Sequence, residues 1–366
     1  MKVLFLVLLL IHAAIHLLGF VKSVRPAAVK MLKQPIPKII GLLWLVAAAL
    51  FLLCAILFSL RLEMWWIISA IALLLSQVLI FRSWRAAKAG TLINLLVLLV
   101  TIPAFAAWNF TREYKQDVAT GIQQTPSQEE LLTEADLAKL PDPVKKYLRY
   151  TGAVGQPKVK NFKVTFTGRI RSKAKPGDWM SFTSEQYNFV EASQRFFFMK
   201  ATMKHLPVNG YHRFEKGNAF MDIRLLSLFR VQYETGKEMG VAETVTFFND
   251  MCCMAPATLI DPRIRWETTD DSSIVKAIFT NENIPISATL YFDSEGRLVN
   301  FVSEDRYAEM ENGTMQRLRW STPLTDYQTF GKYRVAGSAD AVYTYPEGEF
   351  SYGTFRVASI DYNCVK

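Results

Sequence analysis

Four long apolar runs in the first third of the chain restrict its fold more than any other feature. They are Val3–Val21, Ile39–Leu60, Met64–Phe81 and Thr91–Phe110. Each has about the ~20 residues that a helix needs to cross a ~30 Å hydrocarbon core, and a helix satisfies its own backbone hydrogen bonds in lipid. The sequence therefore predicts a four-span transmembrane domain over residues 1–110. The first run lacks a small-residue cleavage site after it, so we expect a retained helix and not a signal peptide.

The charges divide the chain at the same point. Residues 1–110 contain ten Lys or Arg and one acidic residue, whereas residues 111–366 contain 32 basic and 32 acidic residues. A neutral second part argues against nucleic acid as a partner. Eight basic residues lie in the loops after the first and third runs, and four lie on the other side. The positive-inside rule then predicts that both termini and the C-terminal domain lie outside the cytoplasm.

His12 and His16 are the polar residues of the first run with metal-binding chemistry. Their spacing of four places both imidazoles on one face of a helix. Histidine is a common metal ligand, which makes the pair a weak candidate for a metal site. A closed site needs about four ligands, and no other histidine lies in the four runs. We therefore expect a pair hydrogen-bonded within the bundle, and no residue pattern indicates a cofactor.

Residues 111–157 are predicted to be a linker with short helices. Gly121–Pro126 is polar and typical of a linker. Pro143 suits the first turn of a helix over Leu140–Tyr150. From about residue 158 the hydrophobic period changes to two, as Phe162, Val164 and Phe166 alternate with polar residues.

About ten short strands are predicted in residues 158–366. Besides Phe162–Ile170, they are Ser181–Phe189, Arg195–Met203, Tyr211–Glu215, Ala219–Leu225, Ile274–Thr280, Ile286–Phe292, Leu298–Ser303, Met315–Trp320, Ala341–Tyr345 and Gly353–Ile360. Strands with hairpin-length connections form an antiparallel sheet that is strongly curved or closed. One amphipathic helix, Val241–Ala255, interrupts them and ends at Pro256. The predicted fold class is a membrane α bundle plus an antiparallel β half-barrel with a covering helix (α+β).

Several segments of the second part resemble a known family. They are Phe247-Phe248-Asn249-Asp250-Met251 through Asp261, Ile264–Glu267, Ala288–Phe292, Ser303–Tyr307 and Leu140–Tyr150. Together they resemble a bacterial family of uncharacterised membrane-anchored proteins with a C-terminal β-rich domain. The resemblance implies a bacterial cytoplasmic (inner) membrane and no particular activity. At the level of fold alone, the strand count and the covering helix are similar to the LolA/LolB-type lipoprotein carriers, whose curved sheet holds acyl chains.

Two groups of residues in the β domain are candidate sites. The first is a basic run whose side chains could meet anionic lipid headgroups or simply form a solvated strand face that protects a sheet edge; its candidate contacts are Lys163, Arg169, Arg171, Lys173 and Lys175. The second is a polar network that could fix the helix on the sheet or act in acid–base chemistry; its members are Asn249, Asp250, Asp261, Asp305 and Arg306. We expect the structural role, because no nucleophile motif accompanies these residues.

The sequence favours a non-enzymatic binding protein for a hydrophobic or lipid-like ligand, held in the concavity of the sheet. An envelope scaffold or sensor that binds another protein is the alternative, and a hydrolase that uses Asp250 or Asp305 is a third hypothesis. The expected partners are therefore the lipid bilayer, a hydrophobic ligand or an envelope protein. Cys252 and Cys253 are neighbours on the predicted helix and could each pair with Cys364, although buried free thiols are the usual state.

Overall fold

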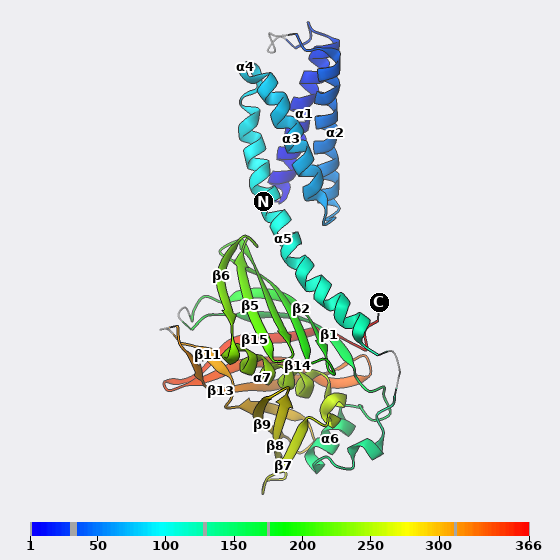
Figure 1. Cartoon of the computed structure of the whole chain (residues 1–366), viewed down its shortest axis with the longest axis vertical. Coiled ribbons are helices and arrows are strands. Elements are labelled where there is room, and N and C mark those ends of the chain that lie inside the picture. The colour runs from blue at the N-terminus through cyan, green and yellow to red at the C-terminus, as the bar shows by residue number, and fades with distance from the viewer. Residues whose placement is uncertain (1, 30–34, 127–129, 174–175, 311–312, 366) are drawn as a thin grey trace. The chain divides into compact units, whose positions relative to one another are not determined.

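The computed structural model divides the chain into two compact units, Met1–Phe110 and Thr111–Lys366 (Figure 1). It describes residues 2–29, 35–126, 130–173, 176–310 and 313–365. Each unit has its own hydrophobic core.

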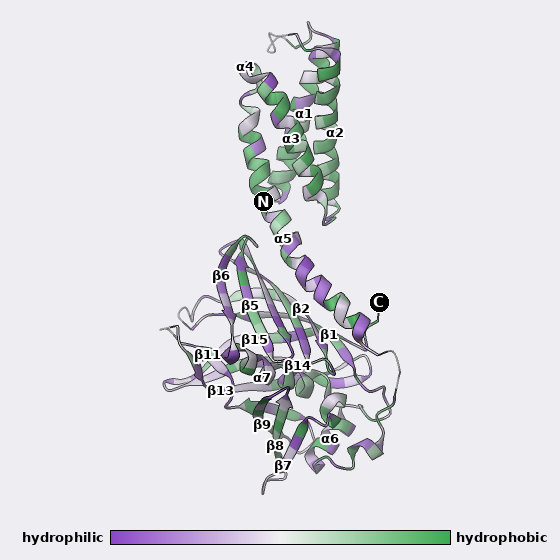
Figure 2. Cartoon of the chain, in the orientation of Figure 1, coloured by the Kyte–Doolittle hydropathy of each residue, from purple (hydrophilic) through white to green (hydrophobic). Residues whose placement is uncertain are grey.

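The first unit consists of apolar helices, and four helices of the described chain are long and apolar enough to cross a membrane. They are α1 (Lys2–Val24), α2 (Lys38–Ser59), α3 (Trp65–Arg82) and α5 (Gly90–Gln124), with a short α4 (Trp84–Ala87) between the last two. Figure 2 shows the apolar character along these helices and its change to polar residues in the last part of α5. Packing inside the bundle buries residues of α1, α2 and α3, such as Leu9, Phe51 and Ala72, while many Leu, Ile and Val side chains point outward, as lipid contact requires.

The end of α5 differs from the prediction. The polar segment from Gly121 was expected to be a linker, yet α5 continues through Gln124 and packs on the outer face of the sheet in the second unit. The hydroxyl of Tyr211 and Nε of Arg213 donate to Asp117 over 2.6 and 3.0 Å. A Cβ on Gly121 would lie 2.5 Å from the ring of Phe189, so this glycine permits the close approach. Gln123 and Gln124 are exposed, so the polar composition here is that of a solvated helix end and not of a loop.

Thirteen strands of the described second unit form one antiparallel sheet, in the order β6-β5-β4-β3-β2-β1-β15-β14-β13-β10-β9-β8-β7. A separate hairpin pairs β11 with β12. The bounds are β1 (Asn161–Ile170), β2 (Met180–Phe189), β3 (Gln194–Met203), β4 (Leu206–Glu215), β5 (Asn218–Leu225), β6 (Phe229–Thr235), β7 (Ile264–Thr268), β8 (Ile274–Asn281), β9 (Ile284–Phe292), β10 (Leu298–Ser303), β11 (Tyr307–Glu309), β12 (Met315–Arg317), β13 (Arg319–Phe330), β14 (Tyr333–Tyr345) and β15 (Gly348–Tyr362).

This arrangement confirms the predicted antiparallel sheet and its helix. Among the described residues, every predicted strand overlaps a strand of the structure, and β6, β7 and β11 were not predicted. β6 and β7 are the edge strands, and α7 (Lys237–Met254) connects them through the concave side of the sheet (Figure 1). The helix packs on strands from both halves of the sheet, including β5, β9 and β14. One end of the domain is covered by α6 (Asp142–Tyr150) and the 3₁₀ turns η1 (Glu134–Leu137) and η2 (Pro256–Ile260).

The helix is more deeply buried than its sequence suggests. Its polar side chains Glu243, Thr246 and Asp250 are buried together with its apolar face. Gly240 explains part of this depth, because a Cβ there would lie 2.2 Å from the carbonyl oxygen of Gly217 in the β4–β5 turn. The polar side of α7 therefore faces the interior of the domain and not solvent, so its polar side chains need partners there.

Candidate functional site

A cavity of about 1000 Å³ lies between α7 and the concave face of the sheet. Its walls come from β1–β6, β13–β15, the β11–β12 hairpin and α7. Strand alternation produces this lining, because every second residue of a strand faces the same side. The lining is mostly apolar and contains seven methionines: Met180, Met199, Met221, Met239, Met254, Met310 and Met315. Methionine is flexible and polarizable, so such walls can adapt to ligands of different shape.

A buried ion cluster forms one wall of the cavity. Arg195 on β3 donates from Nε to Asp250 over 2.7 Å and from Nη1 to Glu243 over 3.0 Å, and both carboxylates come from α7. Gln186 accepts from Nη2 of Arg195 over 2.8 Å, and it and Asn188 donate to the same Asp250 oxygen over 2.8 and 3.2 Å. Burial raises the pKa of Asp250, and the guanidinium opposes this effect. The cluster joins the helix to the sheet by charge-assisted hydrogen bonds.

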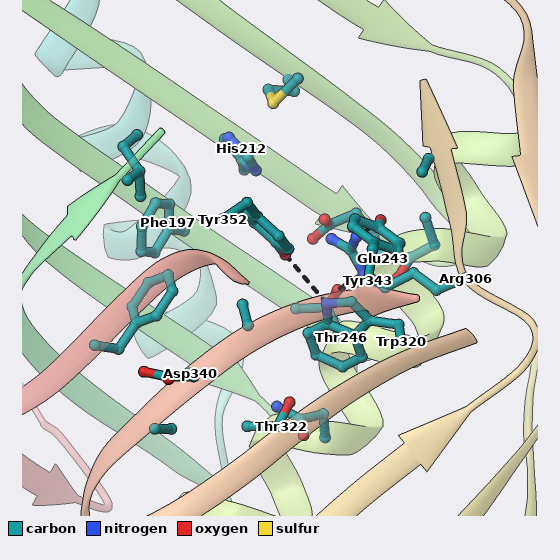
Figure 3. Close-up of a pocket in the computed structure, with 18 of the residues that line it drawn as sticks. Phe197, His212, Glu243, Thr246, Arg306, Trp320, Thr322, Asp340, Tyr343 and Tyr352 are labelled. Carbon is teal, nitrogen blue, oxygen red and sulfur yellow. Dashed lines mark hydrogen bonds between the residues drawn. The ribbon is translucent and has the colours of Figure 1, made fainter. Parts of the chain in front are cut away.

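Arg306, which follows β10, also lines the cavity (Figure 3). Its guanidinium carbon lies 4.8 Å from the ring centre of Trp320 and 5.3 Å from that of Tyr343. Arg306 donates from Nε to the hydroxyl of Thr246 over 3.3 Å and from Nη1 to the hydroxyl of Tyr343. Within the described part of the chain, no carboxylate is within ion-pair distance of this guanidinium. A guanidinium with spare donors in an apolar cavity can bind a carboxylate or phosphate.

His212 also lines the cavity and faces it from β4 (Figure 3). Its ring centre lies 5.5 Å from that of Phe197. The pKa of His212 is lowered to about 4, mainly by removal from bulk solvent; Glu243 raises it, and the positive charges of Arg195 and Arg306 contribute to the lowering. The imidazole is therefore neutral at neutral pH. Cys253 lines the cavity as well, but burial raises the pKa of its thiol, so it is a poor nucleophile.

The predicted polar network is divided in the structure. Asn249, Asp250 and Arg306 line the cavity, but Asp250 pairs with Arg195 and not with Arg306. Asp261 pairs with Arg263 over 2.6 Å in the segment before β7. Asp305 accepts from the backbone N–H of Ser287 over 2.7 Å and pairs with Arg317 over 3.4 Å. Neither Asp261 nor Asp305 lies among the residues that line the cavity.

The basic run takes part in local contacts at the strand surface. Lys163 pairs with Glu185 over 2.8 Å, and Arg169 lies over the ring of Trp179. Arg171 and Lys173 line the rim of the cavity. Arg171 donates from Nε to the carbonyl of Ser351 over 2.8 Å, and Lys173 pairs with Glu347. Lys175 lies outside the described residues.

His12 and His16 lie within a polar network of the helical unit. Nε2 of His12 donates to Oδ1 of Asn94 over 2.7 Å, and Nε2 of His16 hydrogen-bonds to the hydroxyl of Ser76 over 3.0 Å. Among the described residues, no group of three or more His, Cys, Asp or Glu side chains is arranged to hold a metal ion. All four cysteines are free thiols: Cys54, Cys252 and Cys253 are buried, and Cys364 is partly exposed.

Sequence reasoning missed Arg195, Gln186 and Asn188 as partners of Asp250, and Glu243 as the second carboxylate on Arg195. A signal was present, because Ser184, Gln186 and Asn188 are polar residues at the inward-facing positions of β2. Polar side chains at buried positions need partners, and a charged partner on a neighbouring strand could have been sought. Pairing across β2, β3 and α7 is long-range, so the spacing of residues could not reveal it.

Comparison with known proteins finds solved structures to which this chain is similar and a family whose model it matches. The chain is similar to the crystal structure of a LolA superfamily protein from Nitrosomonas europaea, with 9% identity, a TM-score of 0.29, and coverage of 61% of this chain and 93% of that one. A β-barrel-like protein with a domain of unknown function, DUF1849, from Brucella abortus matches with 7% identity, a TM-score of 0.21 and coverage of 56% and 98%. No curated protein matches the chain. Over residues 130–355 the sequence matches the model of the family of unknown function DUF6544, and the chain belongs to that family.

Proposed function

We propose that this protein is a membrane-anchored extracytoplasmic binding protein for a hydrophobic or lipid-like ligand and that it acts without catalysis. The cavity inside the curved sheet is the observation that carries the proposal. Its volume of about 1000 Å³ is at the upper end of the range of small-molecule sites, which are mostly apolar with a few placed polar groups. The four apolar helices would anchor the protein in the bacterial inner membrane, with residues 111–366 outside the cytoplasm.

Arg306 would orient the ligand. The aromatic rings of Trp320 and Tyr343 hold its guanidinium, and the methionine-rich walls would surround an apolar body. An amphiphile with a carboxylate or phosphate at one end satisfies both requirements. The Arg195 cluster would have another role, because the donors on Nε, Nη1 and Nη2 of Arg195 already serve Asp250, Glu243 and Gln186.

Site-specific photocrosslinking in cells tests the proposal. A benzophenone amino acid replaces Met221, which lines the cavity, or Lys276, which is exposed on β8. After irradiation of cells that express the full chain, intact-mass spectrometry reads the adducts. We expect a discrete small-molecule adduct at position 221 and none at position 276. Equal adducts at both positions, or none at position 221, would contradict ligand binding in the cavity.

The role of Arg306 is tested separately with the same crosslinker at position 221. Arg306→Met keeps the length of the side chain and removes its charge, and Arg319→Met is the control because Arg319 is an exposed residue paired with Glu304. We expect a smaller fraction of acidic adduct in Arg306→Met alone. An unchanged adduct in that variant would remove Arg306 from the site and leave the cavity proposal standing.

A further inference from the structure

Two neighbouring hairpin tips expose large apolar side chains to solvent. The β3–β4 tip exposes Met203 (38%) and Leu206 (41%), and the β5–β6 tip exposes Leu228 (39%) and Phe229 (61%). These four residues are called the tip patch below. The two tips lie side by side, because the backbone N–H of Leu226 donates to the carbonyl of Pro207 over 2.8 Å. Exposed apolar side chains that gather in this way usually mark an interaction site.

The backbone of both tips is sharply turned. Lys204 and His205 have φ values of 47° and 68°, and Leu226 and Ser227 have φ values of 56° and 57°. Positive φ at two successive residues suits a tight hairpin turn but is uncommon for a bulky residue such as leucine. The strands thus end in narrow loops that present the tip patch outward.

The charge around the tip patch is positive. Lys200 and Lys204 are exposed, and residues 198–208 contain no acidic residue. On the adjacent hairpin, Arg224 and Arg230 share one carboxylate, that of Asp222. The surroundings therefore carry an excess of cationic groups. Apolar side chains next to basic ones are the combination that favours an anionic lipid surface over a neutral protein surface.

The direction of α5 indicates which end of the sheet carries the tip patch. Along α5, Tyr114 contacts Glu185, Asp117 contacts Tyr211, and Gly121 approaches Phe189. The helix thus runs in the same direction as β2 and β4, and its N-terminal side leads toward the start of β4 and so toward the tips. Toward this end, the strand extends farther than the segment of α5. Leu206 lies five residues before Tyr211, which is about 17 Å along the strand. The segment of α5 in this unit begins at Thr111, which is only about 5 Å along the helix before Tyr114.

The rim of the cavity lies at the same end of the sheet. Arg171 and Lys173 follow β1, whose last residue, Ile170, pairs with Met180 at the start of β2. Glu347, in the β14–β15 turn, also lines the cavity and pairs with Lys173. The other end is covered by α6 and η2.

We propose that the tip patch rests on the surface of a bilayer that contains anionic lipid. The apolar run that ends at Phe110 directly precedes the segment of α5 on the sheet, and in this proposal the end of the sheet toward which that segment leads meets the lipid. Met203, Leu206, Leu228 and Phe229 enter the interface, and Lys200 and Lys204 meet the headgroups. This contact does not depend on ligand binding in the cavity, although it would place the cavity rim close to a source of lipid.

Quenching by spin-labelled lipid tests this inference on the full chain. In a Cys364→Ser background, Leu228→Cys carries a bimane label, and Lys332→Cys in the β13–β14 turn at the opposite end of the sheet is the matched control. The buried thiols should not react in the folded protein, and the background chain without a new cysteine checks this. The chains are reconstituted into vesicles of equal parts phosphatidylglycerol and phosphatidylcholine that contain nitroxide-labelled lipid.

We expect several-fold stronger quenching at position 228 than at position 332. Replacing phosphatidylglycerol with phosphatidylcholine, or adding Lys200→Gln and Lys204→Gln, should reduce the quenching at position 228. Equal quenching at both positions in chains with unchanged thermal unfolding would overturn the inference and would favour a protein partner on the edge strand β6. Quenching at position 228 that does not change when phosphatidylglycerol is replaced with phosphatidylcholine would overturn the assignment of anionic lipid. Neither outcome bears on the crosslinking test of the cavity.

Discussion

Replacing Asp250 with alanine tests how α7 is held in the sheet. The side chains of Asp250 and Arg195 are 6% and 8% exposed, and one Asp250 oxygen accepts from Arg195, Gln186 and Asn188. Removing one partner of a buried pair costs about 3–5 kcal/mol, because the remaining charge is left without compensation. Glu243 still contacts Arg195, so we expect the lower end of this range.

A loss of about 3 kcal/mol lowers the melting temperature of a domain of this size by about 6–12 °C. Thermal unfolding of the full chain in detergent, followed by circular dichroism, measures this shift. Glu304→Ala is the control, because its exposed pair with Arg319 contributes less than about 1 kcal/mol.

A double-mutant cycle then separates pairing from packing. The cycle is made in a Glu243→Gln background, because Glu243 also pairs with Arg195 and would be left as an unpaired buried charge. In that background Arg195→Met combined with Asp250→Leu removes the remaining pair and retains side-chain volume, which often costs less than breaking the pair. We expect this double variant to be more stable than Asp250→Leu alone in the same background. A shift of Asp250→Ala no larger than that of Glu304→Ala would refute the account of the cluster, and so would additive effects of the two substitutions.

Three further predictions concern other contacts of the β domain. The pKa of His212 is about 4 in the folded protein and about 6.5 in the unfolded chain, so the free energy of unfolding is highest above pH 6.5 and decreases by up to about 3 kcal/mol as the pH falls from 6.5 to 4. His212→Gln should flatten that part of the stability–pH curve, and an unchanged curve would contradict this. Gly240→Val brings a side chain against backbone and should cost about 1–3 kcal/mol, whereas Gly177→Ala in open space should not change the melting temperature. Asp117→Ala removes the acceptor of Tyr211 and should cost about 1.5 kcal/mol and speed amide hydrogen exchange in residues 111–124, whereas unchanged exchange would show that the contact does not hold α5.

The sequence predicted the elements whose hydrophobic pattern is local. Apolar runs of ~20 residues and strict alternation, as in Phe162–Phe166, have a direct physical meaning. The edge strand β6 was missed, because exposed residues such as Phe229 and Val231 do not produce a simple buried alternation. The last turns of α5 were missed because their polar residues resemble those of a linker, whereas the hydrogen bonds that hold this part of the helix are made by Tyr114 and Asp117 to strand residues more than 60 positions away.

The site was predicted only in part. Asp250 was identified as a polar residue on a helix among strands, but its partner Arg195 lies 55 residues away on β3, and such pairing depends on the topology of the sheet. The neighbouring residues Asp305 and Arg306 were expected to act together. They follow an extended strand, where successive side chains point to opposite faces, and Arg306 lines the cavity while Asp305 contacts Ser287.

Native mass spectrometry of the full chain, released from detergent micelles, tests the central claim most directly. The comparison is between the wild type and a variant with Met199→Asp and Met221→Asp, which places two carboxylates on the cavity wall and leaves the helical unit unchanged. The account predicts a stoichiometric small-molecule adduct on the wild type that is absent from the folded variant. The same adduct on both proteins, or a wild-type mass without any adduct, would contradict ligand binding in the cavity.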